Sequence, residues 1–433
     1  MKTINREILR LAWPAIATNV TTPLLSLVDI AIVGHIGSVG AIGAVAVGGT
    51  MFSILYFLFA FLRMGTSGLT AQAYGAQDTN GKRLVFKRGL IIALVGGVLL
   101  ILLSEILGDG VLALIEADEN VKPLAKIYFL TAIIGAPGVL TTNVVSGWLL
   151  GMQKSRPIMW IALATNLLNV TLSCVLVFGF NLGVRGVALG TASAQLTGAL
   201  IGLLTVRHFY PQRDPDRPTR RRGVWRQFFS LNSDIFLRTL CLSAVTLWFT
   251  HSGARMGADV LAANSLLLQL FLVFSYFMDG FAFAGEALAG KFYGARDFIQ
   301  LKETIKALIR WGVIMATGCS ILYFLGGQTF LEFLTDSKEV LAATQEYILW
   351  AVSVPFAGFL AFIWDGVFIG LTRSRWMLWS MFSAMIVYFA IYFLLYGHLG
   401  NHALWLAFVI YLAVRGVVAH FLYKSNESRL AKF

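Results

Sequence analysis

Apolar residues form long, nearly unbroken runs along this chain, and short polar segments separate the runs. A run of about twenty apolar residues is long enough to cross the hydrocarbon core of a bilayer as an α-helix. Twelve runs of this kind predict an all-α polytopic membrane protein with twelve transmembrane helices. The predicted helices start near residues 8, 41, 86, 122, 157, 186, 233, 260, 307, 341, 376 and 403.

Two short motifs occur twice in the chain. Residues 74–78 (YGAQD) recur as residues 293–297 (YGARD). Residues 151–156 (GMQKSR) recur as residues 370–375 (GLTRSR), and the offset is 219 residues in both cases. Because each half holds six predicted helices, an even number, both halves enter the membrane from the same side and are related by an axis along the membrane normal. The repeats predict two pseudo-symmetric six-helix lobes, which can rock to give alternating access.

The longest interruption of the apolar pattern, residues 210–227, is rich in proline and arginine. It divides the chain into an N-lobe, residues 1–206 with helices 1–6, and a C-lobe, residues 231–433 with helices 7–12. The linker between them, residues 207–230, is predicted to be cytoplasmic. A proline-rich, charged segment of this kind is either solvated or in contact with anionic lipid headgroups.

Composition and charge agree with a membrane protein. The chain is 58% hydrophobic and only 13% charged, and its formal net charge is +12. Lysine and arginine collect in every second loop, whereas the loop at residues 105–122 carries five acidic residues. Cytoplasmic loops retain basic residues, so both termini are predicted to be cytoplasmic. The net charge therefore reflects topology, and we expect no nucleic-acid partner.

Enzyme signatures are absent from the sequence. There is no phosphate-binding G-x-x-x-x-G-K-[ST] loop and no H-E-x-x-H metal pair. The three cysteines, Cys174, Cys241 and Cys319, lie far apart within apolar runs and are predicted to be buried thiols. We therefore expect neither an enzyme nor a metal or organic cofactor, and an ion gradient is the expected source of energy.

Asp29 is the most informative residue of the first half, because it lies inside the apolar segment 23–34. A charged aspartate at bilayer depth costs about 2.5 to 3.5 kcal/mol, so such residues usually bind or relay ions. The predicted helix directions place Asn169, Ser173 and Thr191 at the same depth, in the outer half of the membrane. These four residues form the predicted ion-coupling site. A lone serine or threonine more often bonds to helix backbone, so Ser173 and Thr191 are the weaker members.

The offset of 219 residues pairs three of these polar positions with Trp248, Tyr388 and Tyr392 in the second half. An aromatic face attracts organic cations, so we hypothesise that the first half handles the ion and the second half offers aromatic surface to a drug-like cation. The alternative is that these aromatic side chains belong to the core or face the lipid.

Other polar residues at membrane depth are secondary candidates. Arg63 is either a substrate or gating residue, or it has an interhelical partner or snorkels to the interface. Asp279 and Asp365 are candidate functional acids of the second half, and Asn143 lies nearer the cytoplasm than Asp29.

Two further predictions concern acids of the second half. Asp234 and Arg238 are four residues apart, a spacing that predicts a local ion pair on one helix. Glu286 lies near the predicted cytoplasmic end of its helix, where we expect it to be hydrated.

Several stretches of the chain resemble the multidrug and toxic compound extrusion (MATE) family, and within it the DinF-like branch. They include PLLSLVDIAIVGHIG, FLRMGTSGLTAQAYGAQD, GWLLGMQKSR, LNSDIFLRTL and DGFAFAGEALAGKFYGARD, in the family's order along residues 5–420. The resemblance implies a V-shaped pair of six-helix lobes that exports cationic or amphiphilic compounds in exchange for H⁺ or Na⁺. It also implies a monomer in the plasma membrane, which for a bacterium is the inner membrane.

The resemblance extends to single residues of the N-lobe. Asp29 matches the coupling acid of helix 1, Asn169 and Thr191 match polar positions of the same network, and Asn143 matches another on helix 4. Where many relatives have N-x-x-L-D on helix 5, this chain ends the motif with Ser173. The lost carboxylate favours H⁺ as the coupling ion, with Na⁺ as the alternative.

Two alternatives to drug export remain at this point. A flippase for a lipid-linked precursor would share the two-lobe scaffold, but it would need several cationic side chains to bind a pyrophosphate group. Arg63 alone gives little support for such a binding site. An intramembrane enzyme or receptor would need a catalytic pair or a large exposed domain, and the sequence shows neither.

Overall fold

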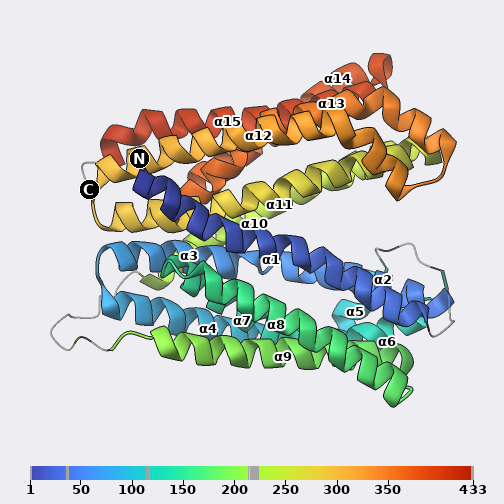
Figure 1. The fold of residues 1–433 in the computed structure, drawn as a ribbon, viewed down its shortest axis with the longest axis horizontal. Helices are drawn as coiled ribbons and strands as arrows, with labels where there is room; N and C mark the ends of the chain where they lie inside the picture. Colours follow the sequence, from blue (N-terminus) through green and yellow to red (C-terminus); the bar gives the residue numbers. More distant parts are fainter. Residues whose placement is uncertain are drawn as a thin grey trace. The chain divides into compact units, whose positions relative to one another are not determined.

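The computed structural model describes residues 2–35, 39–113, 115, 118–119, 121–212, 214 and 224–430. Throughout these residues the secondary structure is helical and no strand occurs (Figure 1). Ten segments are long and apolar enough to cross a membrane. Helices α1 (Lys2–Gly34) and α10 (Val224–Arg255) have 33 and 32 residues, which is also enough to span a bilayer. The expected twelve-helix, all-α fold is confirmed.

The helices of the first half are shorter and more broken than the apolar runs predicted. One span is divided between α2 and α3, another continues from α6 through a 3₁₀ turn into α7, and a π-helical turn extends α8. In order they are α2 (Val39–Phe57), α3 (Ala60–Gly75), α4 (Thr79–Leu102), α5 (Ser104–Leu112), α6 (Lys122–Ala132), η1 (Ile133–Gly135), α7 (Ala136–Gly151), α8 (Ser155–Cys174), η2 (Val175–Gly179) and α9 (Gly183–Phe209).

The helices of the second half are longer than the hydrocarbon core requires, because they continue past the apolar run into the flanking polar residues. They start within about ten residues of the predicted positions, as boundary predictions commonly do. After α10 they are α11 (Ala258–Gly294), α12 (Phe298–Leu334), α13 (Lys338–Gly370), α14 (Ser374–Leu399) and α15 (Asn401–Leu430).

The chain divides into two compact units. The first unit is residues 17–222, and the second unit is residues 1–16 together with 223–433. The first turns of α1 therefore pack with the second half of the sequence, which the order of the apolar runs does not reveal. A Cβ atom on Gly280 of α11 would lie 2.4 Å from Cγ1 of Ile16, so only glycine permits this contact.

The start of α1 and the end of α15 lie at the same end of the second unit (Figure 1). Near the start of α1, Glu7 forms an ion pair with Lys291 at 3.1 Å. Near the end of α15, Glu427 pairs with Lys302 at 2.9 Å. Because Lys291 and Lys302 flank the short turn between α11 and α12, the two termini share one side.

The sequence repeat is reproduced in the backbone of the two halves. Three pairs of residues with a left-handed backbone conformation lie 219 positions apart, and the aspartates that precede α4 and α12 both cap their helix. The paired left-handed residues are Gln77 (φ 53°) and Arg296 (φ 59°), Gln153 (φ 63°) and Thr372 (φ 53°), and Asn181 (φ 53°) and Gly400 (φ 52°). The caps are Asp78, which accepts from the Gly81 N–H at 2.8 Å, and Asp297, which accepts from the Gln300 N–H at 3.0 Å.

Equivalent glycines also bring equivalent helices together. A Cβ atom on Gly147 of α7 would lie 2.3 Å from the carbonyl oxygen of Arg63 on α3. At the matching position of the second half, a Cβ atom on Gly366 of α13 would lie 2.1 Å from the carbonyl oxygen of Ala282 on α11. Small residues allow membrane helices to pack backbone against backbone, so each unit is built around the same close helix pair.

Replacing Gly366 with Ala should destabilise the protein by about 1 to 3 kcal/mol, the usual cost of overpacking a tight core. The cause is the contact with the Ala282 carbonyl, which is too short for any Cβ atom. Thermal unfolding in detergent measures the effect. Gly318→Ala is the matched control, because the space around that helical glycine is open and alanine favours helix. A Gly366 variant that melts at or above the Gly318 variant would contradict this prediction.

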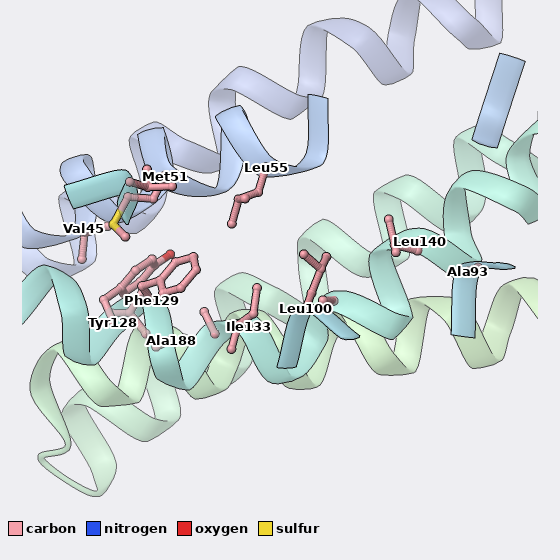
Figure 2. Close-up of a cluster of buried hydrophobic side chains, with 14 of the residues drawn as sticks. Val45, Met51, Leu55, Ala93, Leu100, Tyr128, Phe129, Ile133, Leu140 and Ala188 are labelled. Carbon is pink, nitrogen blue, oxygen red and sulfur yellow. The ribbon is translucent and has the colours of Figure 1, made fainter. Parts of the chain in front are cut away.

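The first unit has its own apolar core. Figure 2 shows Tyr128 and Phe129 of α6 facing Val45 and Met51 of α2. Phe52 of α2 stacks on Phe129, with ring centroids 5.0 Å apart. This core fixes α6 against α2, and thereby fixes the position of the Tyr128 side chain.

Candidate functional site

Asp29 lies on α1, in the part of that helix that belongs to the first unit, and its side chain is buried. Its Oδ1 atom is inaccessible and has no hydrogen-bond partner among the residues that the structure describes. A buried carboxylate without donors is costly unless a proton or a cation neutralises it. Asp29 therefore has the environment expected of an ion-coupling acid.

Two of the predicted partners are joined directly. The Asn169 Nδ2 amide on α8 donates to the Thr191 hydroxyl on α9 at 3.0 Å, and that hydroxyl donates to the Val187 carbonyl at 3.0 Å. The Oδ1 atom of Asn169 is buried and has no partner in the described part of the chain. The helix directions inferred from the sequence thus placed Asn169 and Thr191 correctly with respect to each other.

Tyr128 of α6 connects this pair with the acid. It is a side-chain hydrogen-bonding partner of Thr191, and it lies close enough to Asp29 for the two side chains to interact electrostatically. The phenol is buried. Tyr128 was not predicted from the sequence, because the candidates in the first half were an acid, an arginine, amides and the hydroxyls of serine and threonine, and no phenol of that half was among them.

Gly48 of α2 makes room for the Tyr128 ring. A Cβ atom at Gly48 would lie 2.2 Å from Cδ1 of that ring, so any larger residue would displace it. The elements that build the site are therefore α1, α6, α8 and α9, with α2 covering the phenol.

Ser173 of α8 is completely buried, but it lies against the backbone of α9. A Cβ atom on Gly190 would lie 2.5 Å from the Ser173 Oγ atom. Glycine is therefore needed at position 190, because any Cβ atom there would collide with Ser173. The participation of Ser173 in ion coupling stays a prediction.

In the second unit, Asp365 of α13 accepts hydrogen bonds from Arg238 of α10 and from Arg415 of α15. All three side chains are buried. The predicted local pair of Asp234 with Arg238 is therefore wrong. Arg238 turns to the acid of another helix inside the protein, and Asp234 instead accepts a hydrogen bond from the Ser374 hydroxyl at 2.6 Å.

Glu286 is also placed differently from the expectation that it is hydrated, since its side chain is only 1% exposed. The cause is the close packing of α13 on α11, where a Cβ atom on Gly370 would lie 2.5 Å from the Glu286 carbonyl oxygen.

The aromatic residues at the equivalent positions of the second unit pack together. The rings of Trp248 and Tyr392 meet edge to face with centroids 5.9 Å apart. Tyr388 and Tyr392 are 0% and 3% exposed, and Tyr388 contacts Tyr411 with centroids 6.1 Å apart. Tyr388 and Tyr392 are core residues in this structure and Trp248 is half-buried, and a role of the three in binding a cationic substrate stays a prediction.

The remaining candidates lie outside the hydrogen-bonded network of Asn169, Thr191 and Tyr128. Arg63 on α3 and Asn143 on α7 are partly buried in the first unit, and Asp279 on α11 is partly buried in the second. Arg63 and Asp279 both have interaction partners.

Comparison with known proteins shows the family to which this chain belongs. A family model described as MatE matches residues 14–175 and 235–394. The chain belongs to the MatE family. It is 39% identical over 416 residues to the DNA damage-inducible protein F of Escherichia coli (strain K12), covering 95% of this chain and 90% of that protein. Members of the family are membrane transporters and not enzymes, as the sequence led us to expect.

More distant relatives share the family and the fold. A "Probable multidrug resistance protein NorM" of Photorhabdus laumondii is 24% identical over 354 residues, covering 78% of this chain and 75% of that protein. The crystal structure of the Vibrio cholerae MATE transporter VcmN has a TM-score of 0.89 at 18% identity, covering 99% of this chain and 98% of that chain. This likeness confirms the predicted two-lobe arrangement of twelve helices.

Proposed function

We propose that this protein is a secondary active antiporter that exports cationic or amphiphilic drug-like compounds in exchange for H⁺. The observation that carries the proposal is Asp29, a buried carboxylate with an unpartnered oxygen beside Tyr128 in the first unit. The NorM relative, described as a probable multidrug resistance protein, supports drug export. We propose the plasma membrane as the membrane in which the protein acts.

The coupling step requires only that Asp29 gain and lose a proton. With the proton bound, the buried group is neutral, and without it a negative charge lies among apolar helices. The two states of the acid therefore favour different conformations of a rocking transporter, because a ligand shifts an equilibrium by its differential affinity for the two states. Tyr128 supplies a hydrogen-bonding group near the acid and connects it with the Asn169–Thr191 pair.

H⁺ is favoured over Na⁺ by the composition of the site. A proton needs one acceptor, whereas a hard cation needs several oxygen ligands. Asp29 is the single carboxylate of the proposed network, and the position of a second family acid holds Ser173, which lies against Gly190.

The flippase alternative has little support from charge. A pyrophosphate group would need several cations that are not already neutralised. Arg238 and Arg415, which are buried in the second unit, share the single carboxylate of Asp365, so this cluster keeps a net charge of only +1 for a pyrophosphate group.

The test is the transport of a cationic dye by proteoliposomes after a pH jump, with and without a sodium gradient. The measured quantity is the accumulation ratio of the dye across the vesicle membrane. Each pH unit supplies about 1.4 kcal/mol, so a one-unit gradient should give about tenfold accumulation of the dye. A sodium gradient alone should give no accumulation. Accumulation driven by sodium without a pH gradient would show that Na⁺ is the coupling ion, and accumulation with neither gradient would rule out an antiporter.

The same vesicles test the stoichiometry when the voltage is clamped with potassium. One proton exchanged for one monovalent cation moves no net charge, so the membrane potential, worth about 2.3 kcal/mol per charge per 100 mV, should not contribute. A strong dependence on voltage would mean a second proton or a different substrate charge.

A further inference from the structure

The repeated turn GLTRSR, residues 370–375, joins α13 to α14. Part of this motif has a clear structural role. Gly370 permits the close contact with α11, and the buried Ser374 hydroxyl donates to Oδ2 of Asp234 at 2.6 Å, which ties the start of α14 to α10. These contacts do not involve the two arginines of the turn, Arg373 and Arg375.

A cavity of about 200 Å³ opens beside this turn. Both arginines line it, together with Trp376 at the start of α14 and with Ser230 and Asp234 of α10. Among the described residues that line the cavity, two carry a guanidinium group and one carries a carboxylate, and one oxygen of that carboxylate already accepts the Ser374 hydrogen bond. The cavity is net positive.

Arg373 is held in place before any ligand arrives. Its Nη2 atom donates to the Tyr293 hydroxyl at 3.4 Å, and its guanidinium carbon lies 5.5 Å from the centroid of the Trp376 ring. An ordered guanidinium loses less side-chain entropy on binding, and its planar fork matches the oxygens of a phosphate group. Arg375 is exposed and completes the pair of donors.

The cavity lies where the apolar span α13 ends and the span α14 begins, on the side of the membrane predicted to carry the basic loops. Tryptophan favours the headgroup level of a bilayer, and basic residues beside a span attract anionic lipids. Pockets for drug-sized ligands usually hold about 300 to 1,000 Å³, so this smaller cavity suits a compact headgroup better than a nucleotide.

We propose that this cavity binds the phosphate group of an anionic phospholipid headgroup, with Arg373 and Arg375 as the phosphate donors. The site is separate from transport chemistry, and the proposal rests only on the location of the protein in a membrane. Trp376 positions the Arg373 guanidinium by stacking against it.

The first half of the chain provides an internal control. Lys154 and Arg156 occupy the matching positions of the repeated turn and are exposed on the basic side. Pro157 stands where the second half has Trp376, and Ala15 stands where it has Asp234. Removing Lys154 and Arg156 takes away the same charge and leaves the cavity intact.

The experiment measures binding of phosphatidylglycerol to the full chain in detergent micelles, by native mass spectrometry, against phosphatidylcholine as the neutral lipid. The Arg373→Gln, Arg375→Gln double variant should bind phosphatidylglycerol about thirtyfold more weakly, from about 1 kcal/mol for each arginine. The Lys154→Gln, Arg156→Gln variant should bind like the wild type. If the double variant does not fold, Arg375→Gln alone, which changes an exposed side chain, should show about a fivefold loss.

The outcomes separate the sources of the phosphate. Competition by millimolar glycerol phosphate as effective as that by the lipid would overturn the assignment to a phospholipid. Equal weakening by the two double variants would overturn the site, since charge on the basic side would then account for binding. Changing both arginines to lysine, Arg373→Lys with Arg375→Lys, keeps the charge and removes the planar forks, so this variant should bind with intermediate affinity.

Discussion

Replacing Asp365 with Asn should destabilise the second unit by about 3 to 5 kcal/mol, the cost of removing one side of a buried ion cluster. Asp365, Arg238 and Arg415 are 9%, 8% and 4% exposed, and they join α13, α10 and α15. Without the carboxylate, two guanidinium groups would lie side by side inside the protein with no anion between them. We expect a large fall in the temperature of unfolding in detergent.

Removing one arginine should be much less harmful. Arg238→Gln leaves Asp365 paired with Arg415, so the cluster becomes a neutral pair and no unpaired charge remains. Asp336→Asn, at an exposed position, controls for the loss of an acid as such. If Arg238→Gln lowers the melting temperature as much as Asp365→Asn, the carboxylate does not act as the shared counterion of both arginines.

The membrane spans and the repeat could be predicted from the sequence because both depend on local or periodic patterns. An apolar run of sufficient length crosses a bilayer wherever it occurs, and a fixed offset between matching motifs implies matching positions in two lobes. The structure reproduces that offset down to the left-handed residues Gln153 and Thr372. The packing of the first turns of α1 on α11 could not be predicted in this way, because it depends on the three-dimensional fit at Gly280.

The candidate site was predicted only in part, because some of its contacts follow from topology and others depend on packing. Helix direction and depth brought Asn169 and Thr191 together correctly, since both follow from topology. The choice of partner for Arg238 could not be predicted in this way. A spacing of four residues on one helix makes a contact possible, but an acid on a facing helix competes for the same guanidinium group. Which of the two acids forms the ion pair depends on how the helices pack.

Replacing Asp29 with Asn should abolish accumulation of a cationic dye driven by a pH gradient. Asparagine has nearly the same shape as aspartate but cannot take up or release a proton in this range of pH. With a one-unit gradient, the wild type should accumulate the dye about tenfold and the variant should stop at a ratio of one. Proteoliposomes with matched protein content provide the measurement, and Asp259→Asn, at an exposed position of α11, is the control.

A loss of accumulation could also come from a damaged fold, and stability separates the two causes. The Asp29 carboxylate is buried with an unpartnered oxygen, so its neutral replacement should melt at the same temperature as the wild type or higher. Thr191→Val removes the hydroxyl shared by Asn169 and Tyr128 and keeps the acid, so it should slow export and retain the tenfold ratio. If the Asp29→Asn protein still accumulates dye in response to a pH gradient, Asp29 is not the coupling residue. The variant has no titrating group at position 29, so another group would have to carry the proton. The ratio at steady state, and not the initial rate, is therefore the decisive quantity, since only the coupling ion sets it.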